Sequence, residues 1–266
     1  ALWDRLTRGR LMSQPIERFG VISGMIETAE NLAKDYDISR EMADEYAVSS
    51  HRKAAAAWDA GKFDAQLVPL DVPQRKGDPL RFERDEGFRP DASMETLGGL
   101  RPIEKGGVVT AGNASQQNDA AAACFVVAED KLEELGLEPM LWFNGWAAAG
   151  CDPARMGIGP VPAVERLFAR LGRGWEDIDL VELNEAFAPQ VLAVLKGWGW
   201  SADDSRREML NVNGSGISLG HPIGATGGRI LADMAHELHR REGRYALETM
   251  CIGGGQGLAA LFERAA

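Results

Sequence analysis

IDLVELNEAFAPQVLAVLKGWG, residues 178–199, is the stretch that decides the fold of this chain. Its first six residues are a short apolar run that favours a strand, and residues 185–199 have the length and apolar content of a helix. A strand that leads directly into a helix is the repeating unit of domains in which helices pack on a sheet. The stretch therefore predicts an α/β protein.

The same alternation continues on both sides of this stretch. Further strands are predicted at 65–72, 140–150, 210–214, 245–254 and 255–263, and helices at 129–135, 161–172 and 224–241. Small and β-branched residues predict two more buried strands, at 107–112 and 120–130. The predicted fold is a layered α/β domain, a mixed sheet with helices on both faces.

The N-terminal half predicts a loop-rich helical domain that covers a site. Apolar residues recur at helical spacing in 21–36, and Ser39 is placed to cap a long helix over 39–63. The polar segment 73–105 is too long to be a simple connector. Regular alternation of strands and helices begins near residues 110–117, where we place the boundary between the covering domain and the α/β domain.

Composition narrows the class of protein. The chain has 266 residues, 45% of them hydrophobic, and a formal net charge of -11. This acidic balance argues against nucleic acid or an anionic membrane as a partner, since no general positive field attracts phosphates. Three cysteines without CxxC spacing favour a reducing compartment, and no apolar run approaches the roughly 18–20 residues of a membrane span. We expect a cytoplasmic protein without membrane insertion.

A histidine stands in the glycine-rich segment NVNGSGISLGHPIGATGGR (211–229). Glycines on both sides of His221 let backbone or ligand approach the imidazole closely, and Pro222 restricts the chain just after it. Histidine is the usual general acid or base near neutral pH and a usual partner of a thiol nucleophile. The alternative is a structural histidine in a tight turn, which the density of glycines disfavours.

A cysteine stands in a second glycine-rich turn, CIGGGQG (251–257). Cys251 ends a predicted strand, and the small residues after it expose backbone N–H groups, as an oxyanion hole requires. Its thiolate could act as nucleophile or base, and the alternative is an inert strand cysteine beside a glycine hairpin. The two turns together predict one active site that contains His221 and Cys251. Cys124 and Cys151 lack such a setting and are interpreted as structural.

Two further turns are candidates for the same site. In NEAFAPQ (184–190), Asn184 follows a predicted strand. Its amide can hold a water or donate to a developing oxyanion, and the alternative is a cap on the next helix. In TAGNASQQND (110–119), Ser115 or a backbone N–H can meet a ligand, and a plain loop is an equally good interpretation.

Taken together, these four segments resemble the thiolase family. The segment 211–229 is similar to its histidine signature, CIGGGQGLAALFE to its C-terminal cysteine signature, and NEAFA and GNAS to its other two markers. GMIETAEN (24–31) resembles the start of its substrate-covering loop domain. The resemblance implies a CoA-dependent acyltransferase that forms or cleaves 3-ketoacyl-CoA. CoA thioesters are then its substrates, with no permanently bound cofactor and no metal.

The resemblance also implies roles for individual residues. Cys251 matches the acid/base cysteine that moves the α-proton of acetyl-CoA, and His221 matches the histidine that activates the nucleophilic cysteine. Asn184 would position a water in the oxyanion hole that His221 lines, and the N–H of Gly253 would belong to a second hole. The implied contacts with CoA and substrate are Ser115 and Ala111 beside the pantetheine, Arg89 near the adenine, and Phe187 and Met25 in the substrate channel.

The family's acyl-accepting cysteine lies in an N-terminal motif that none of the three cysteines matches. We therefore expect a loop domain at 1–115, a remnant of the N-terminal thiolase domain at 116–137 and the C-terminal thiolase domain at 138–266. The missing sulfur is expected from another N-terminal segment or chain, so this chain alone is expected to be inactive. Gln116, Gln117 and Ser215 depart mildly from the family's glycine pattern, which leaves the acyl-chain preference open.

Two other functions are compatible with these patterns. A non-catalytic CoA-binding or scaffold subunit would keep the fold without the nucleophile. A related condensing enzyme would use its own histidine and asparagine contexts, and the cysteine at 251 argues against it. We also expect a homo-oligomer, either a dimer or a tetramer.

Overall fold

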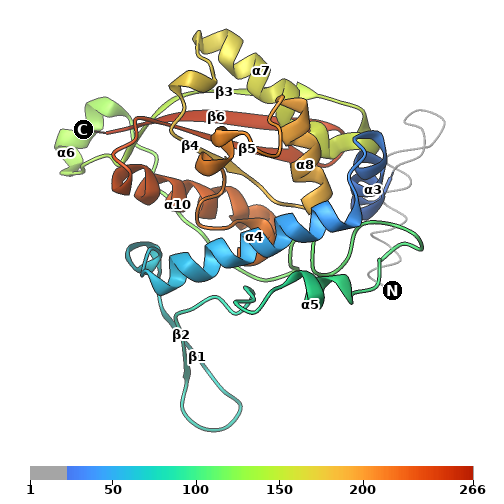
Figure 1. Cartoon of the computed structure of the whole chain (residues 1–266). Helices are drawn as coiled ribbons and strands as arrows, with labels where there is room; N and C mark the ends of the chain where they lie inside the picture. The colour runs from blue at the N-terminus through green and yellow to red at the C-terminus, as the bar shows by residue number, and fades with distance from the viewer. Residues whose placement is uncertain (1–22, 266) are drawn as a thin grey trace, which may run out of the picture.

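The computed structural model describes residues 23–265, and its centre is a four-stranded mixed sheet (Figure 1). The strands lie in the order β3 (Leu141–Gly150), β6 (Gln256–Arg264), β5 (Tyr245–Ile252) and β4 (Leu180–Leu183). β4 and β5 run parallel, whereas β5–β6 and β6–β3 are antiparallel pairs. Because β4 and β5 are parallel, the residues that follow them emerge at the same edge of the sheet.

Helices cover both faces of this sheet, as predicted. α7 (Pro160–Leu171) and α8 (Ala188–Gly197) pack on one face, and α10 (Thr226–Arg240) packs on the other (Figure 1). α7 and α10 each bury one apolar stripe, whereas α8 is buried from Ala188 to Leu195, as a helix that is apolar all round requires. Apolar side chains of both helices and of the sheet form the main core, among them Val164, Leu167, Val191, Leu195, Leu247 and Leu261.

A second group of helices lies beside this layered domain. α3 (Met25–Asp35) packs against α8, and α4 (Arg40–Asp59) crosses the molecule next to α8 and α9 (Gly216–Leu219) (Figure 1). Ser39 caps α4 as predicted, because its hydroxyl accepts a hydrogen bond from Met42 N at 3.1 Å. Residues 1–22 of the predicted covering domain, including the start of the predicted helix at 21–36, lie outside the described residues.

The described residues of the predicted covering domain contain more helix and strand after α4 than the sequence predicts. The strand predicted at 65–72 is reduced to β1 (Leu70–Val72), which pairs with β2 (Leu80–Phe82) in a hairpin that projects from the molecule (Figure 1). β2 and the short helix α5 (Met94–Gly98) both fall in the segment predicted to be a polar loop. α4 ends at Asp59, earlier than predicted, and Gly61 follows in the left-handed region with φ 65°.

The strand predictions at 107–112, 120–130 and 210–214 are wrong. Residues 120–128 pair with no strand of the described chain, and Phe125 and Val126 expose 95% and 88% of their surface. An apolar segment becomes a buried strand only where neighbouring strands satisfy its backbone groups. At 210–214 the chain turns, since Asn211 has φ 43°, and only isolated bridges are left.

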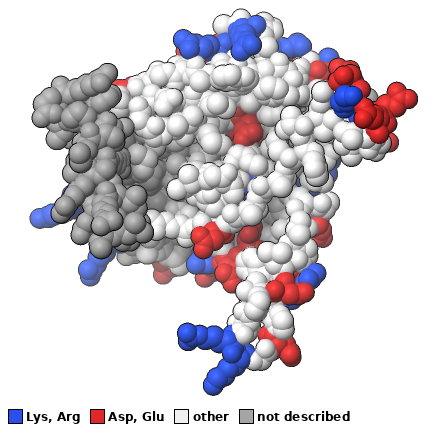
Figure 2. Space-filling view, turned by 180° about the vertical axis from the view of Figure 1, so that it is seen from behind, with Lys and Arg blue, Asp and Glu red and all other residues white. Residues whose placement is uncertain are grey.

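Charged side chains are unevenly distributed. Few of them cover the middle of the face seen in Figure 2, and acidic ones gather at the corner that contains α6 (Leu132–Leu135). No helix between residues 23 and 265 combines the length and the apolar content needed to cross a bilayer.

Candidate active site

Asn184 follows β4 at the carboxyl edge of the sheet. It is fully buried, and its backbone N–H donates to Thr249 O at 3.0 Å, which extends the β4–β5 ladder by one residue. Its Nδ2 lies 3.4 Å from His221 Nε2, and its Oδ1 has no hydrogen-bond partner among the described residues. The alternative interpretation, a cap on the next helix, is wrong, because α8 starts at Ala188 with Phe187 as its N-cap.

His221 lies in the turn between α9 and α10. Gly220 before it has φ 91°, a conformation that residues with a side chain rarely adopt. The His221 Nδ1 atom lies 2.7 Å from Thr226 Oγ1. Burial lowers the pKa of His221, and the charge of Arg229 lowers it further, so the imidazole is neutral at neutral pH. A ring protonated at Nδ1 satisfies both contacts, because it donates to Thr226 and accepts from the Asn184 amide.

Cys251 lies near the end of β5, opposite Gly257 of β6. The parallel pairing of β4 and β5 brings Cys251 and Asn184 to the same edge of the sheet, although no hydrogen bond joins them within residues 23–265. The surrounding protein desolvates the thiol and raises the pKa of Cys251 to about 12. At neutral pH the group is therefore a protonated thiol, a proton donor, and not a preformed thiolate.

Gly253 lies in the exposed turn between β5 and β6. A Cβ atom there would meet nothing within 4 Å, so the backbone is open to approach. Gly254 and Gly255 have φ of 90° and 88°, so the turn requires glycine at both positions. Cys151 N donates to Gly255 O at 2.8 Å and fastens this turn to the end of β3.

The two markers NEAFA and GNAS meet in the structure. Ser115 N donates to Ala186 O at 2.9 Å, and Ala188 N donates to Asn113 O at 2.8 Å. Ala114 and Phe187 form an isolated antiparallel bridge between these two bonds. The pairing thereby places Ser115 next to Phe187, in the segment that follows β4.

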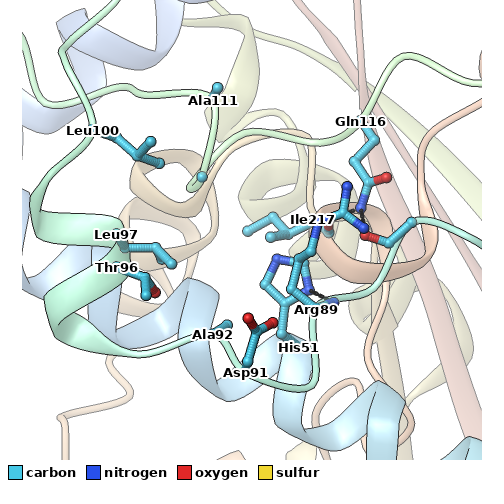
Figure 3. A pocket seen from close by; sticks show the side chains of 12 residues that line it. His51, Arg89, Asp91, Ala92, Thr96, Leu97, Leu100, Ala111, Gln116 and Ile217 are labelled. Atoms are coloured by element: carbon cyan, nitrogen blue, oxygen red, sulfur yellow. Dashed lines mark hydrogen bonds between the residues drawn. The ribbon is translucent and has the colours of Figure 1, made fainter.

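A cavity of about 310 Å³ lies between α4, α5 and residues 111–116 (Figure 3). Arg89 and Ala111 line it, and Figure 3 shows them on different sides of the space, with Arg89 beside His51 and Gln116. His51 Nδ1 accepts a hydrogen bond from the Arg89 backbone N–H at 3.1 Å, and burial lowers the pKa of His51. The neutral His51 ring thus holds the Arg89 backbone in place.

The other predicted binding residues lie outside this cavity. Met25 begins α3 with 40% of its surface exposed, and neither it nor Ser115 or Phe187 lines the space. Within the described residues, no cluster of three or more histidine, cysteine, aspartate or glutamate side chains is arranged to hold a metal ion.

Comparison with known proteins identifies the family. The family model described as "Thiolase, N-terminal domain" matches residues 11–130, and the one described as "Thiolase, C-terminal domain" matches residues 137–264. The chain belongs to the thiolase family. How this thiolase chain divides into a covering domain, a remnant and a C-terminal domain is still a prediction.

Curated thiolases resemble the chain along most of its length. It is 51% identical over 238 residues to an acetyl-CoA acetyltransferase of Cupriavidus necator, and this match covers 89% of the chain and 59% of the relative. A second protein of the same organism, beta-ketothiolase BktB, is 52% identical over 239 residues, with the same coverage. The chain thus spans about 59% of the length of these relatives.

Solved thiolase structures have the same fold. The acetyl-CoA acetyltransferase of Bacillus anthracis superposes with a TM-score of 0.84 at 43% identity, over 95% of this chain and 62% of that one. Human mitochondrial 3-ketoacyl-CoA thiolase in complex with CoA superposes with a TM-score of 0.81 at 42% identity, over 91% of this chain and 59% of that one.

Sequence reasoning missed a buried charge cluster in this thiolase. Glu182 on β4 is fully buried with both carboxylate oxygens unpartnered among the described residues, and burial raises its pKa well above the usual range. Burial also raises the pKa of Glu248 to about 7, while Arg229 acts in the opposite direction on both carboxyls. A charged residue in a strand pattern predicts a solvent-facing position, so no sequence signal marks this cluster.

Proposed function

We propose that this chain supplies the oxyanion-stabilising and proton-transfer part of a thiolase active site, which forms or cleaves 3-ketoacyl-CoA. The observation that carries the proposal is the contact between Asn184 Nδ2 and His221 Nε2 at 3.4 Å. The contact lies at the carboxyl edge of β4 and β5, where Cys251 also emerges. An amide, an imidazole and a thiol at one edge are the groups that acyl transfer between thioesters requires.

The neutral imidazole suits two successive steps. The Nε2 lone pair of His221 accepts the proton of an attacking thiol, which becomes the thiolate nucleophile. The protonated ring then donates from Nε2 to the oxygen that gains negative charge as the thiolate adds to the thioester carbonyl. Asn184 Nδ2 carries N–H groups toward the same point, directly or through a water.

Cys251 suits the proton transfer at carbon. In the cleavage direction its thiol gives a proton to the carbanion of the departing acetyl-CoA, and in synthesis its thiolate removes that proton. Because its pKa of about 12 favours the thiol, the chain as described is set for donation. Synthesis requires a neighbouring donor or positive charge that lowers this pKa.

The cavity beside α4 supports CoA as the ligand. Its exposed Arg89 guanidinium suits a phosphate, and small residues such as Ala111 and Gly112 leave room for a narrow pantetheine chain. We propose that CoA runs from Arg89 past residues 111–115 toward Asn184. The cytoplasmic location and the homo-oligomeric state are still predictions from the sequence.

The second sulfur of the reaction comes, in this proposal, from another part of the thiolase. Cys124 is exposed on a segment that pairs with no strand of residues 23–265, and burial raises the pKa of Cys151, so neither is set up as the acyl carrier. The exposed Phe125 and Val126 support a further thiolase segment that pairs with residues 120–128.

Acetoacetyl-CoA thiolysis by the chain completed with a thiolase N-terminal segment tests the proposal. We expect turnover with wild type and a loss of about 100-fold or more with Asn184→Ala, the scale on which single oxyanion donors act. Cys251→Ser is expected to lower turnover sharply at unchanged CoA affinity. CoA binding without turnover in the completed wild-type protein would instead identify a non-catalytic CoA-binding subunit.

A further inference from the structure

Glu185 is a buried carboxylate just beyond the end of β4, and the proposed chemistry gives it no role. It exposes 1% of its surface. Its Oε1 accepts hydrogen bonds from Tyr46 Oη at 2.8 Å and Asn211 Nδ2 at 3.0 Å. Its Oε2 accepts from Ser50 Oγ at 2.7 Å and from the Ile217 backbone N–H at 3.2 Å. A carboxylate offers about four lone-pair sites, so these donors satisfy it fully.

The four donors come from three separate segments, α4, the turn after residue 210 and α9. Burial and the neighbouring carboxylate raise the pKa of Tyr46 well above its usual range, so its hydroxyl stays protonated and remains a donor. Because a carboxylate only accepts, Ser50 uses its single hydroxyl proton on Glu185. Ser218 of α9 is therefore the donor in the 2.8 Å contact with Ser50 Oγ, which is shorter than the 3.3 Å contact of the same hydroxyl with Ser215 O. The carboxylate thus joins α4 to α9 by two routes.

α9 leads directly to His221. Gly216 at its start packs so closely on the chain after β4 that a Cβ atom would lie 2.6 Å from Glu185 O and 3.0 Å from Asn184 Oδ1. A shift of α9 away from Glu185 would move His221 relative to Asn184, because only Gly220 separates the helix from the histidine. The carboxylate is therefore placed to set the Asn184–His221 contact.

Stability alone is a poor reason for this arrangement. All four partners of Glu185 are neutral donors: a phenol, a hydroxyl, an amide and a backbone N–H. Burying a carboxylate whose hydrogen-bond partners are all neutral costs more free energy than burying an apolar side chain of similar size. The Lys53 ammonium interacts electrostatically with Glu185, but its hydrogen bond goes to Leu210 O. The carboxylate instead fixes the positions of α4, the turn after residue 210 and α9 relative to one another, although these segments are distant in sequence.

We propose that Glu185 is a positioning residue, which sets the His221–Asn184 geometry by tying α4 and α9 to the end of β4. The importance of Glu185 for acyl transfer rests on the proposed function. The effect of Glu185 on the orientation and titration of the His221 ring does not depend on that function. The positioning role and the proposed function can therefore fail separately.

The test follows the imidazole of His221 by nuclear magnetic resonance in Glu185→Gln. Glutamine keeps the shape, but its NH₂ group faces the Ile217 N–H or the Asn211 amide, so one donor loses its partner. The chain has 4 histidines, and the His221 signals are assigned with His221→Gln. Glu30→Gln is the matched control, because Glu30 also accepts backbone N–H bonds, from Val108 and Val109, away from His221.

We expect Glu185→Gln to raise the pH at which His221 titrates, because the loosened turn admits water and relieves the burial that lowers its pKa. The single Nδ1–H pattern is expected to become a mixture of tautomers, and Glu185→Asp is expected to recover it in part. Glu30→Gln should leave both readouts at their wild-type values.

Unchanged His221 titration and tautomer in folded Glu185→Gln would overturn the inference and leave a merely structural carboxylate. If that variant does not fold, Tyr46→Phe and Ser50→Ala each delete one donor and should give smaller shifts in the same direction. The absence of any shift in both would again overturn it. Acetoacetyl-CoA thiolysis by the completed wild-type chain judges the proposed function separately, whatever His221 does.

Discussion

Nδ2 of Asn184 lies 3.4 Å from Nε2 of His221, although 37 residues separate them in the chain. The imidazole is held from its other side by Thr226 Oγ1, 2.7 Å from Nδ1. A ring fixed at both nitrogens by neutral partners has one favoured tautomer, and burial keeps it uncharged. This relationship makes His221 a proton acceptor at Nε2 before substrate arrives.

His221 is expected to titrate below its ordinary pKa of 6.5, because burial and Arg229 disfavour the charged form. The unfolded chain then binds more protons between the two pKa values, so this histidine contributes stability above pH 6.5 that is lost as the pH falls. Thr226→Val removes the Nδ1 partner and should raise the population of the Nε2–H tautomer. Resonances of His221 that titrate at or above pH 6.5 would contradict this account.

Arg89→Ala is expected to weaken CoA binding about 10-fold, or ~1.4 kcal/mol, as the loss of a partly exposed phosphate contact does. Calorimetric titration of both proteins with CoA measures the difference. Arg81→Ala is the control, because Arg81 lies on the projecting hairpin beside Asp71, at 3.2 Å. Equal affinities for Arg89→Ala and wild type would remove Arg89 from the site.

The chain alone is expected to form no stable acetyl-enzyme with acetyl-CoA. With a pKa of about 12, Cys251 is a thiolate in only about one molecule in ten thousand at pH 8. Iodoacetamide should therefore modify the exposed Cys124 first and Cys251 last. Intact-mass measurement checks both statements, and a stoichiometric acetyl adduct on any cysteine would show a nucleophile that this assignment of roles lacks.

Glu248→Gln is expected to stabilise the chain at pH 8 and much less at pH 4.5. Burial raises the pKa of Glu248 to about 7, so the native state holds this proton more tightly than the unfolded state does. Stability is consequently lost as the pH rises from about 4.5 to 7, and the loss persists above pH 7. Removing the Glu248 charge should therefore raise the Tm at pH 8, by roughly 2–4 °C for each kcal/mol of stability regained in a domain of this size.

The exposed Glu133→Gln is the control for this measurement and should change the Tm little at either pH. A gain for Glu248→Gln that is larger at pH 4.5 than at pH 8 would have the wrong sign and would exclude a raised pKa.

Phe125→Ser is expected to reduce self-association of the isolated chain. Phe125 exposes 95% of its surface on a segment that pairs with no described strand, which is a surface that attracts other chains. Val68→Ser is the control, since Val68 is 81% exposed but lies next to the hairpin. Sedimentation velocity at several concentrations compares them, and equal effects of the two substitutions would argue against a specific role of residues 120–128.

Local patterns in the sequence determined most elements of the layered domain. The apolar stripes of α7 and α10 and the cap at Ser39 act within a few residues, so they can be identified without knowing what lies opposite. The strand predicted at 120–130 failed because pairing depends on partners elsewhere. The same apolar residues are buried in a sheet where neighbouring strands pair with them and are left exposed where no strand does.

The sequence by itself also marked Asn184, His221 and Cys251, since each stands at a glycine-rich turn or directly after a strand. Only the tertiary structure decided that the Asn184 amide faces the imidazole, that Cys251 is a protonated thiol, and that Glu185 joins α4 to α9. Hydrogen-bond partners and pKa values depend on which groups from distant segments surround an atom and exclude water from it. The order of residues along the chain does not contain that information in any local form.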